Sequence, residues 1–363
     1  MGSARGQLGD SGVGASPASV KRSVRPSTPA DAAAIVALLT EVGLQPSRNL
    51  QHLQWKYWHA RADWPGPRSF VVTSGGEPIA HAALIPGACS WRDRHIKTVH
   101  MIDWAARRSE AGAGSALMKY IAQHADALLA IGGSADTLRI LPYMGFRSAG
   151  VVTGYVRTLS PLRLLEAGQI PAVKLLPRLA RSVAWTLTAP APRVKGWEAR
   201  RLAAEDADAI AGVLPVATDT MGVTQRGVEL FRHVLSCPIA PMALFAVERT
   251  GRAAGYFLLA YLPGQVRIAD CWLDSDRARD WRALILCAVA QARREPHAAE
   301  VVIWASDPLL AGALEASGFH ARSRMPLQIR PAAASSVPAA SLRVQMLDND
   351  AAFYHTDGPE LWA

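Results

Sequence analysis

The chain contains little cysteine, and its cysteines are far apart. The four cysteines share no C-x-x-C spacing, and none of the ten histidines falls in an H-E-x-x-H pattern. Zinc ribbons, disulfide frameworks and zinc proteases depend on such spacings. The sequence therefore predicts a protein without a metal site, in a reducing, cytoplasmic compartment.

Long apolar runs are also missing. No run approaches the roughly 18 consecutive apolar residues of a membrane-spanning helix. Residues 1–21 are rich in Gly, Ser and Ala and lack the apolar centre of a signal peptide. We interpret residues 1–21 as a disordered tail and expect no transmembrane segment.

Lysine is scarce in a chain that is nevertheless basic. Only six of the 39 basic residues are Lys, and the formal net charge is +9. Arginine suits phosphate and carboxylate recognition, although a GC-rich genome also produces this composition. The basic residues are spread along the chain and do not interleave with aromatic ones, as single-strand binding requires. We expect no nucleic-acid partner.

The most informative feature that is present is a glycine turn. A strand-like run over residues 98–104 precedes it, and a helix-like run over residues 115–131 follows it. Glycine lets backbone N–H groups approach a phosphate closely, and a helix N-terminus adds partial positive charge. The turn therefore predicts a site for a pyrophosphate-bearing cofactor, formed by Ser109, Glu110, Ala111, Gly112, Ala113, Gly114 and Ser115.

An ordered series of motifs occurs twice along the chain. Each series runs strand, helix, hairpin, strand, helix, strand and a Gly-Phe pair, with Asp103 of the first copy matching Asp270 of the second. Such an ordered repeat predicts tandem domains. We expect domains at residues 22–158 and 197–330, an amphipathic linker at 159–196, and a linker with a C-terminal segment at 331–363.

The two copies differ at the glycine turn. Gly112-Ala113-Gly114 of the first copy aligns with Arg279-Asp280-Trp281 of the second. Because Arg and Trp replace the two glycines, the close backbone approach to a phosphate is lost. We expect one cofactor site, in the first copy.

The element order, the turn and the Gly145-Phe146 pair resemble the GCN5-related N-acetyltransferase (GNAT) family. That family's signature is Gln/Arg-x-x-Gly-x-Gly/Ala; both glycines match, and Ser109 occupies the first position. The resemblance implies an α/β fold, with a mostly antiparallel twisted, mixed sheet flanked by helices in each domain. It also implies acetyl-CoA or another acyl-CoA, with its pyrophosphate on residues 110–115 and its pantetheine along Ile102 to Trp104.

Three residues are candidates for proton transfer. Strand alternation places Asp103 and His100 on opposite faces, so either can face the cleft. Asp103 has an alternative role in orienting a turn, because Asp270 occupies its position in the copy without the glycine turn. Tyr143 precedes the Gly-Phe pair by two residues, whereas the family often has a tyrosine four before it. Tyr143 is thus a candidate general acid or a packing residue.

The linker at 159–196 alternates leucines with basic residues, and Pro177 is expected to interrupt any single helix. Such a segment can lie on an anionic membrane surface, or its helices can pack between the domains. We favour packing.

The resemblance implies a cytoplasmic N-acetyltransferase that acts on a primary amine of a small molecule, an amino sugar or amino acid derivative. The alternative is a non-catalytic CoA-binding protein or scaffold in a polysaccharide or cell-envelope pathway, since Trp55-Lys56-Tyr57 resembles a subgroup linked to such pathways. An aminoacyl-tRNA-dependent transferase is a third interpretation, which the glycine turn argues against. A homodimer is left open.

Overall fold

The computed structural model describes residues 22–91, 94–166, 172–331, 342–353 and 361–363. The predicted tail at 1–21 and residues 332–341 of the linker predicted from residue 331 lie outside these ranges. No helix among the described residues is long and apolar enough to cross a membrane.

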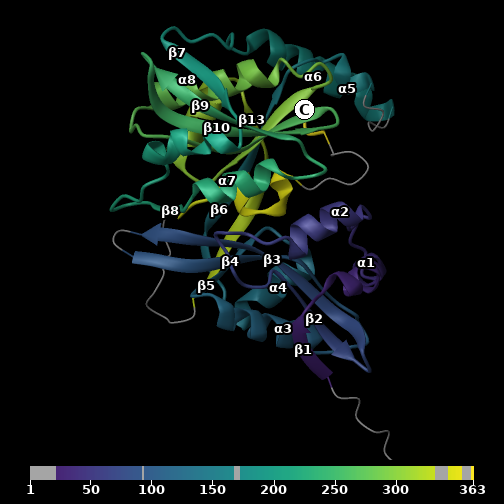
Figure 1. Ribbon diagram of the computed structural model, residues 1–363. Helices are drawn as coiled ribbons and strands as arrows, with labels where there is room; N and C mark the ends of the chain where they lie inside the picture. The colour runs from purple at the N-terminus through teal and green to yellow at the C-terminus, as the bar shows by residue number, and fades with distance from the viewer. Residues whose placement is uncertain (1–21, 92–93, 167–171, 332–341, 354–360) are drawn as a thin grey trace, which may run out of the picture.

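The N-terminal half alternates strands and helices in the expected order (Figure 1). Its strands are β1 (Arg22–Pro26), β2 (Ser69–Ser74), β3 (Glu77–Trp91), β4 (Arg94–Ala106), β5 (Ala127–Ile131) and β6 (Arg147–Thr158). Its helices are α1 (Ala32–Glu41), α2 (Leu50–Leu53), α3 (Ala113–Ile121) and α4 (Ala135–Ile140), with short turns η1 (Pro29–Asp31), η2 (Gln54–Trp58), η3 (Ala122–His124) and η4 (Leu141–Met144).

Two helices connect the halves, α5 (Arg163–Glu166) and α6 (Ala172–Thr188). The C-terminal half has strands β7 (Trp197–Leu202), β8 (Gly222–Thr224), β9 (Met242–Arg249), β10 (Arg252–Leu262), β11 (Gln265–Leu273), β12 (Glu300–Ala305), β13 (His320–Pro331) and β14 (Leu342–Arg343). Its helices are η5 (Glu205–Val213), α7 (Val228–Leu235), α8 (Ala278–Ala292), α9 (Pro308–Ala316), η6 (Met346–Asp348) and η7 (Asp350–Ala352).

The strands form one continuous mixed sheet with helices on its faces. Its order is β1-β2-β3-β4-β5-β13-β6-β12-β11-β10-β9-β7, with β8 and β14 off this path. In each half three antiparallel strands lead to a parallel pair, β4 with β5 and β11 with β12. The same pairing pattern therefore occurs in both halves.

The halves exchange their last strands. β6 pairs with β12, while β13 pairs with β5 and β6. The strand that ends each half therefore completes the sheet of the other. Cutting the chain between the predicted domains would remove one strand from each sheet, so experiments need the full chain.

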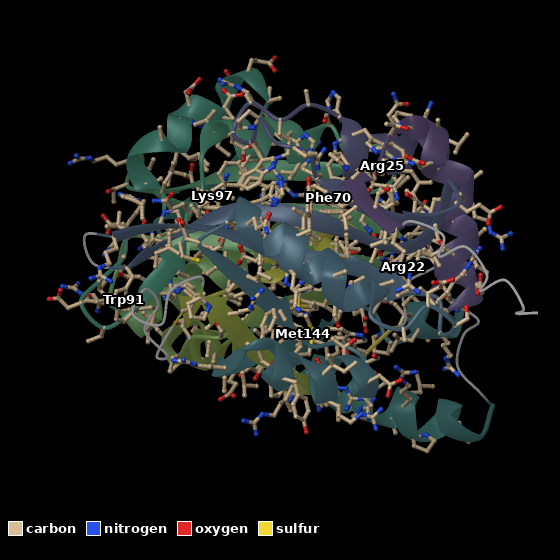
Figure 2. All side chains as sticks on the ribbon, turned by 90° about the horizontal axis from the view of Figure 1, so that it is seen from below. Arg22, Arg25, Phe70, Trp91, Lys97 and Met144 are labelled. Carbon is tan, nitrogen blue, oxygen red and sulfur yellow. The ribbon has the colours of Figure 1, made fainter. Side chains whose placement is uncertain are left out.

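Helices α1 and α2 cover one face of the N-terminal sheet, and α3 covers the other. Phe70 belongs to the apolar cluster under α3, and Tyr57 to the cluster under α1. Figure 2 shows Trp91 and Lys97 at one end of the long β3–β4 hairpin, far from Arg22 on β1. This far end faces the C-terminal half, since β3 also pairs with β8.

Two local predictions were wrong. The helix expected over residues 115–131 ends at Ile121, and its apolar end forms the buried strand β5. A short apolar run fits a buried strand as well as a helix, and pairing with β4 and β13 decides between them. Helix α6 also continues through Pro177. Pro177 is exposed and lies on the outer side of the helix.

Candidate cofactor and acceptor site

The glycine turn leads directly into helix α3, as the sequence predicts. Gly112 caps the helix with φ +81°, and no atom would lie within 4 Å of a Cβ at this position. An L-residue is strained in this left-handed conformation, so glycine is favoured. The turn therefore has the backbone and the open space that a phosphate requires.

Four backbone N–H groups of this turn have no acceptor among the described residues. They belong to Ala111, Gly112, Gly114 and Ser115, as expected at a helix N-terminus. The N–H of Glu110 donates to Arg107 O at 3.0 Å, and that of Ala113 donates to Glu110 O at 3.1 Å. The six donors predicted over residues 110–115 are thus reduced to four.

Arg22 holds the outside of the turn. Its guanidinium donates to Glu110 Oε2 at 2.7 Å and to Ala111 O at 3.0 Å. On the inside, Trp104 Nε1 donates to Gly114 O at 3.2 Å, and a Cβ on Gly114 would lie 3.4 Å from Trp104 Nε1. The turn is thereby anchored to β1 and β4, and Arg22 neutralises the nearby Glu110 carboxylate.

Strands β4 and β5 separate beside this turn. They pair only over residues 98–100 of β4, so the segment from Met101 to Ala106 has no partner strand on that side. The separated segment contains Ile102 and Trp104, the residues expected along a pantetheine. Backbone polar groups at such an edge are available to a ligand that lies along the strand.

The chain itself occupies the matching place in the C-terminal half. Strands β11 and β12 pair over residues 265–268 and then separate, and η6 contacts both. Gln345 accepts a hydrogen bond from Cys271 N at 3.0 Å and donates to Cys271 O at 2.7 Å. Gln345 thus bonds to both main-chain groups of the residue that matches Trp104.

The turn that matches the glycine turn is closed as well. Trp281 is buried and donates through Nε1 to Ser275 O at 2.7 Å, and the ring lies 4.5 Å below the Arg343 guanidinium. The N–H groups of Asp280 and Trp281 both donate to Arg277 O. The Asp280 carboxylate also lies at this helix start, where it would repel a phosphate.

A β-bulge determines where Asp103 points. Asp103 and Trp104 together oppose Ala82 of β3, and Asp103 has φ +49°. This irregularity reverses the expected alternation: Asp103 faces α2 and η2, on the same side as Ile102, and Trp104 faces α3. The predicted strand alternation, which placed Asp103 opposite His100, was therefore wrong at Asp103, because a bulge shifts the alternation by one residue.

Asp103 lies in a network of buried charges. Lys56 Nζ is 2.7 Å from Asp103 Oδ2 and 2.8 Å from Asp350 Oδ2, and Tyr57 donates to Asp103 Oδ2 at 2.7 Å. Burial alone would raise the pKa of Asp103, but Lys56 and Tyr57 outweigh burial and lower it. Asp103 is therefore ionised at neutral pH and is a weak proton acceptor.

His81 supports the bulge from β3. Its Nδ1 donates to Asp103 O at 3.2 Å, and its Nε2 accepts from Ser69 Oγ at 2.9 Å. Burial lowers the pKa of His81 to about 4, so the ring is neutral.

The other two predicted catalytic residues are placed differently. His100 is buried, donates to Leu129 O at 3.0 Å and accepts from Asn349 Nδ2 at 2.8 Å, so both ring nitrogens are occupied. Tyr143 is 90% exposed on η4, while Leu141 at the family's usual tyrosine position is buried. Neither position suits proton transfer in an enclosed site, so we assign no catalytic role to either residue.

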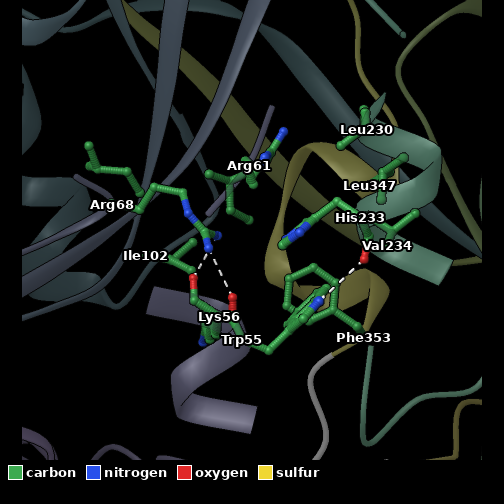
Figure 3. A pocket seen from close by; sticks show the side chains of 12 residues that line it. Trp55, Lys56, Arg61, Arg68, Ile102, Leu230, His233, Val234, Leu347 and Phe353 are labelled. Carbon is green, nitrogen blue, oxygen red and sulfur yellow. Dashed lines mark hydrogen bonds between the residues drawn. The ribbon is translucent and has the colours of Figure 1, made fainter. Parts of the chain in front are cut away.

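A cavity of about 420 Å³ lies between the halves. Charged residues of both signs line it, together with apolar side chains: Arg61, Asp63, Trp64, Lys97, Arg226, Leu230 and Asp348. A smaller inner pocket shares Arg61 and Leu230 with this cavity and reaches Ile102 and Lys56 (Figure 3). The inner pocket thus borders β4, the strand that carries Asp103.

His233 of α7 faces Arg61 and Arg68 across the inner pocket (Figure 3). Its ring stacks on Trp55 at 4.8 Å. Burial and then the charges of Arg61 and Arg68 lower its pKa to about 3. A neutral imidazole thus lies opposite two arginines in a pocket whose other lining residues are mostly apolar.

Sequence reasoning missed the groups that complete this site from elsewhere in the chain. Asp348 and Asp350 come from the C-terminal segment, and Arg226 comes from the loop before α7. Lys56 carried the only local signal, since it stands among the apolar residues of the segment from Leu53 to Trp58. A lysine in such a segment is buried only with a partner.

The fold is that of the GNAT proteins. Solved structures similar to this chain include a GCN5-related N-acetyltransferase from Anabaena variabilis, with 12% identity and a TM-score of 0.55. The match covers 85% of this chain and 72% of that one. One from Kribbella flavida has 14% identity, TM-score 0.53, and coverages of 86% and 71%. Saccharomyces cerevisiae N-myristoyltransferase, solved with bound myristoyl-CoA, has 15% identity, TM-score 0.59, and coverages of 86% and 83%. No family model matches the sequence, and no curated protein is similar to it in sequence.

Proposed function

We propose that this chain is an acyl-CoA-dependent N-acyltransferase whose N-terminal half holds the cofactor. One observation carries the proposal: four unbonded N–H groups surround an open glycine turn beside the separation of β4 and β5. Helix N-termini of this kind bind phosphate. The similar fold of proteins described as N-acetyltransferases and of an N-myristoyltransferase with bound acyl-CoA supports it.

The residues of this half fit an acyl-CoA. The N–H groups of Ala111, Gly112, Gly114 and Ser115 would hold the pyrophosphate, and the free edge of β4 from Ile102 to Trp104 would hold the pantetheine. Arg108 precedes the turn, is exposed, and has no carboxylate within 4 Å among the described side chains. The cofactor supplies an activated thioester.

We further propose that the acceptor is a small primary amine bound in the cavity between the halves. An amino acid derivative fits better than an amino sugar, because charged groups of both signs line the wall: Lys97 and the Arg61–Asp63 and Arg226–Asp348 ion pairs. Asp103 would orient the amine through its ionised carboxylate. The amine proton would leave to water, since the pKa of Asp103 is held low.

We propose a single cofactor site and a cytoplasmic location. Gln345 and Trp281 occupy the matching places in the C-terminal half. The four cysteines are all buried and free, as suits a reducing compartment. The two series of elements are then tandem copies of one domain, the second degenerate.

Calorimetry of the full chain with acetyl-CoA and, separately, myristoyl-CoA tests the binding step. We expect one site per chain for at least one of them; no binding of either would overturn the proposal. Release of the CoA thiol with a panel of amines then tests turnover, and amino acid derivatives are expected to exceed amino sugars.

A second candidate function is a non-catalytic CoA-binding protein. Three observations favour it: Asp103 is held in an ion pair, both nitrogens of His100 are occupied, and Tyr143 is exposed. Binding of acyl-CoA without thiol release across the amine panel would support this candidate and exclude the first.

A further inference from the structure

Helix α6 exposes a continuous apolar face. Its exposed residues recur at helical spacing, and Leu176, Val183 and Leu187 are 75%, 40% and 81% exposed. At about 100° per residue these positions lie on one side of the helix. From Leu176 on, and apart from Thr188 at the end, that side consists of Leu176, Pro177, Ala180, Val183, Ala184 and Leu187.

The polar side of α6 faces the protein. Ser182 is fully buried, and the Arg178 guanidinium donates to the carbonyl oxygens of Leu361 and Ala363. This orientation is the reverse of a usual surface helix, whose apolar side packs on the core. Because the Arg178 guanidinium is bonded to Leu361 and Ala363, α6 cannot rotate to bury its leucines without breaking these hydrogen bonds.

Positive charge without a nearby carboxylate borders the apolar face. The Arg181 and Arg322 guanidinium groups lie 4.9 and 6.0 Å from the Trp185 ring centre, and Trp185 stacks on His320 at 3.9 Å. Neither arginine has a carboxylate within 4 Å among the described side chains. Burial, then the charges of Arg322 and Arg178, lower the pKa of Arg181, as expected for uncompensated cations.

The arginines beside the apolar face of α6 indicate what kind of partner binds there. A second copy docked face to face would bring the same arginines together, and like charges repel. An anionic lipid surface would neutralise them and accept the leucines. A helix with an apolar side bordered by arginine and tryptophan is typical of peripheral membrane binding.

We propose that α6 binds the surface of an anionic membrane. Leu176, Val183 and Leu187 insert among the acyl chains, and Arg181 and Arg322 contact the headgroups. Figure 1 shows α6 at the outer edge of the C-terminal half, at the opposite end of the molecule from α3. Membrane binding therefore leaves the glycine turn accessible, and this proposal does not depend on the proposed function.

Co-sedimentation of the full chain with vesicles tests the proposal. We expect binding to phosphatidylcholine vesicles that contain phosphatidylglycerol, and at least tenfold weaker binding to phosphatidylcholine alone. The double variant L176S/L187S should bind at least about 100-fold more weakly, since each buried leucine contributes tenfold or more. Arg322→Glu should weaken binding about tenfold, and less in high salt.

Val216→Ser is the matched control, because Val216 is 69% exposed but lies outside α6. Its vesicle binding should equal that of the unmodified chain. Circular dichroism of each variant should show an unchanged fold, since the substituted side chains are exposed. Three results would overturn the proposal: no binding to anionic vesicles, unchanged binding of L176S/L187S, or a dimer in sedimentation velocity that L176S/L187S converts to monomer.

Discussion

The two halves of the molecule separate a parallel strand pair in the same way but treat the resulting edge differently. In the N-terminal half, β4 continues past β5 beside a glycine turn with four unbonded N–H groups. In the C-terminal half, Gln345 bonds to the main chain of β11, and Trp281 fills the matching turn. The strand frame is therefore shared, and the chemistry at its open edge differs.

The halves nevertheless keep one buried arrangement in common. Asp103 accepts from Tyr57 and pairs with Lys56, while Asp270 accepts from Tyr256 at 2.7 Å and pairs with Arg226 at 2.8 Å. Asp350 and Asp348 of the C-terminal segment complete the two networks. Because both halves hold the aspartate this way, ion pairing alone does not identify a catalytic carboxylate.

Among the variants that test this difference between the halves, Gly112→Trp is expected to have the largest effect. The indole would occupy the open space at the turn, and the left-handed backbone would be strained, so acyl-CoA affinity in calorimetry should fall at least 100-fold. The control is Gly251→Trp in the β9–β10 hairpin, which has φ +79° and equally open surroundings. Equal losses in both variants would refute the turn as the phosphate site.

Asp103→Asn and Asp270→Asn compare the two aspartates directly. Each change disturbs a buried ion pair, so each should lower the free energy of unfolding by about 3 kcal/mol in urea titrations. Asp103→Asn should also reduce kcat about 100-fold at saturating acyl-CoA, because the amine would lose the carboxylate proposed to orient it. We expect Asp270→Asn to change kcat less than about threefold, because we propose no acyl-CoA site in that half. Similar kcat values for the two variants would assign Asp103 a purely structural role.

Gln345→Ala tests whether Gln345 covers a cofactor site in the C-terminal half. The change leaves the Cys271 N–H and carbonyl without partners, at a cost of about 2–4 kcal/mol in the free energy of unfolding. We expect the acyl-CoA stoichiometry to stay at one per chain, because Trp281 still blocks the turn. A second binding site in this variant would show that the C-terminal half kept its own cofactor site.

The smallest predicted effect concerns His81. The matching residue in the C-terminal half is Tyr256. The pKa of His81 is lowered from 6.5 to about 4, so below pH 6.5 the unfolded chain binds more protons than the folded one. The burial of a neutral His81 ring therefore contributes fully to the free energy of unfolding above pH 6.5, and this contribution is lost as the pH falls towards 4. Between pH 6.5 and 5 the loss is about 2 kcal/mol.

Urea titrations at both pH values check this prediction. In His81→Gln the drop in unfolding free energy between pH 6.5 and 5 should be about 2 kcal/mol smaller than in the unmodified chain. His297→Gln is the control, since His297 is exposed. An unchanged pH dependence in His81→Gln would mean that His81 is not neutral in the fold.

Much of the fold was predictable because the signals were local. Hairpins at Gly75–Gly76 and Thr250–Gly251, and the turn at Gly112, follow from short-range turn chemistry. A strand after the second helix was predicted, but its position at β5 was not, because its run of five apolar residues is too short to show a period. The bulge at Asp103 was missed too, since nothing in the residues from Met101 to Ala105 marks an extra residue.

The sequence by itself determined the order of elements, the glycine turn and the absence of both glycines at the aligned positions of the second half, because these depend on neighbouring residues. Only the tertiary structure decided the strand exchange, the direction of Asp103, the neighbours of Lys56 and the outward face of α6. Each of these depends on contacts between segments far apart in the chain, such as Lys56 with Asp350. Such contacts form only when the whole sheet has assembled, so no short stretch of residues encodes them.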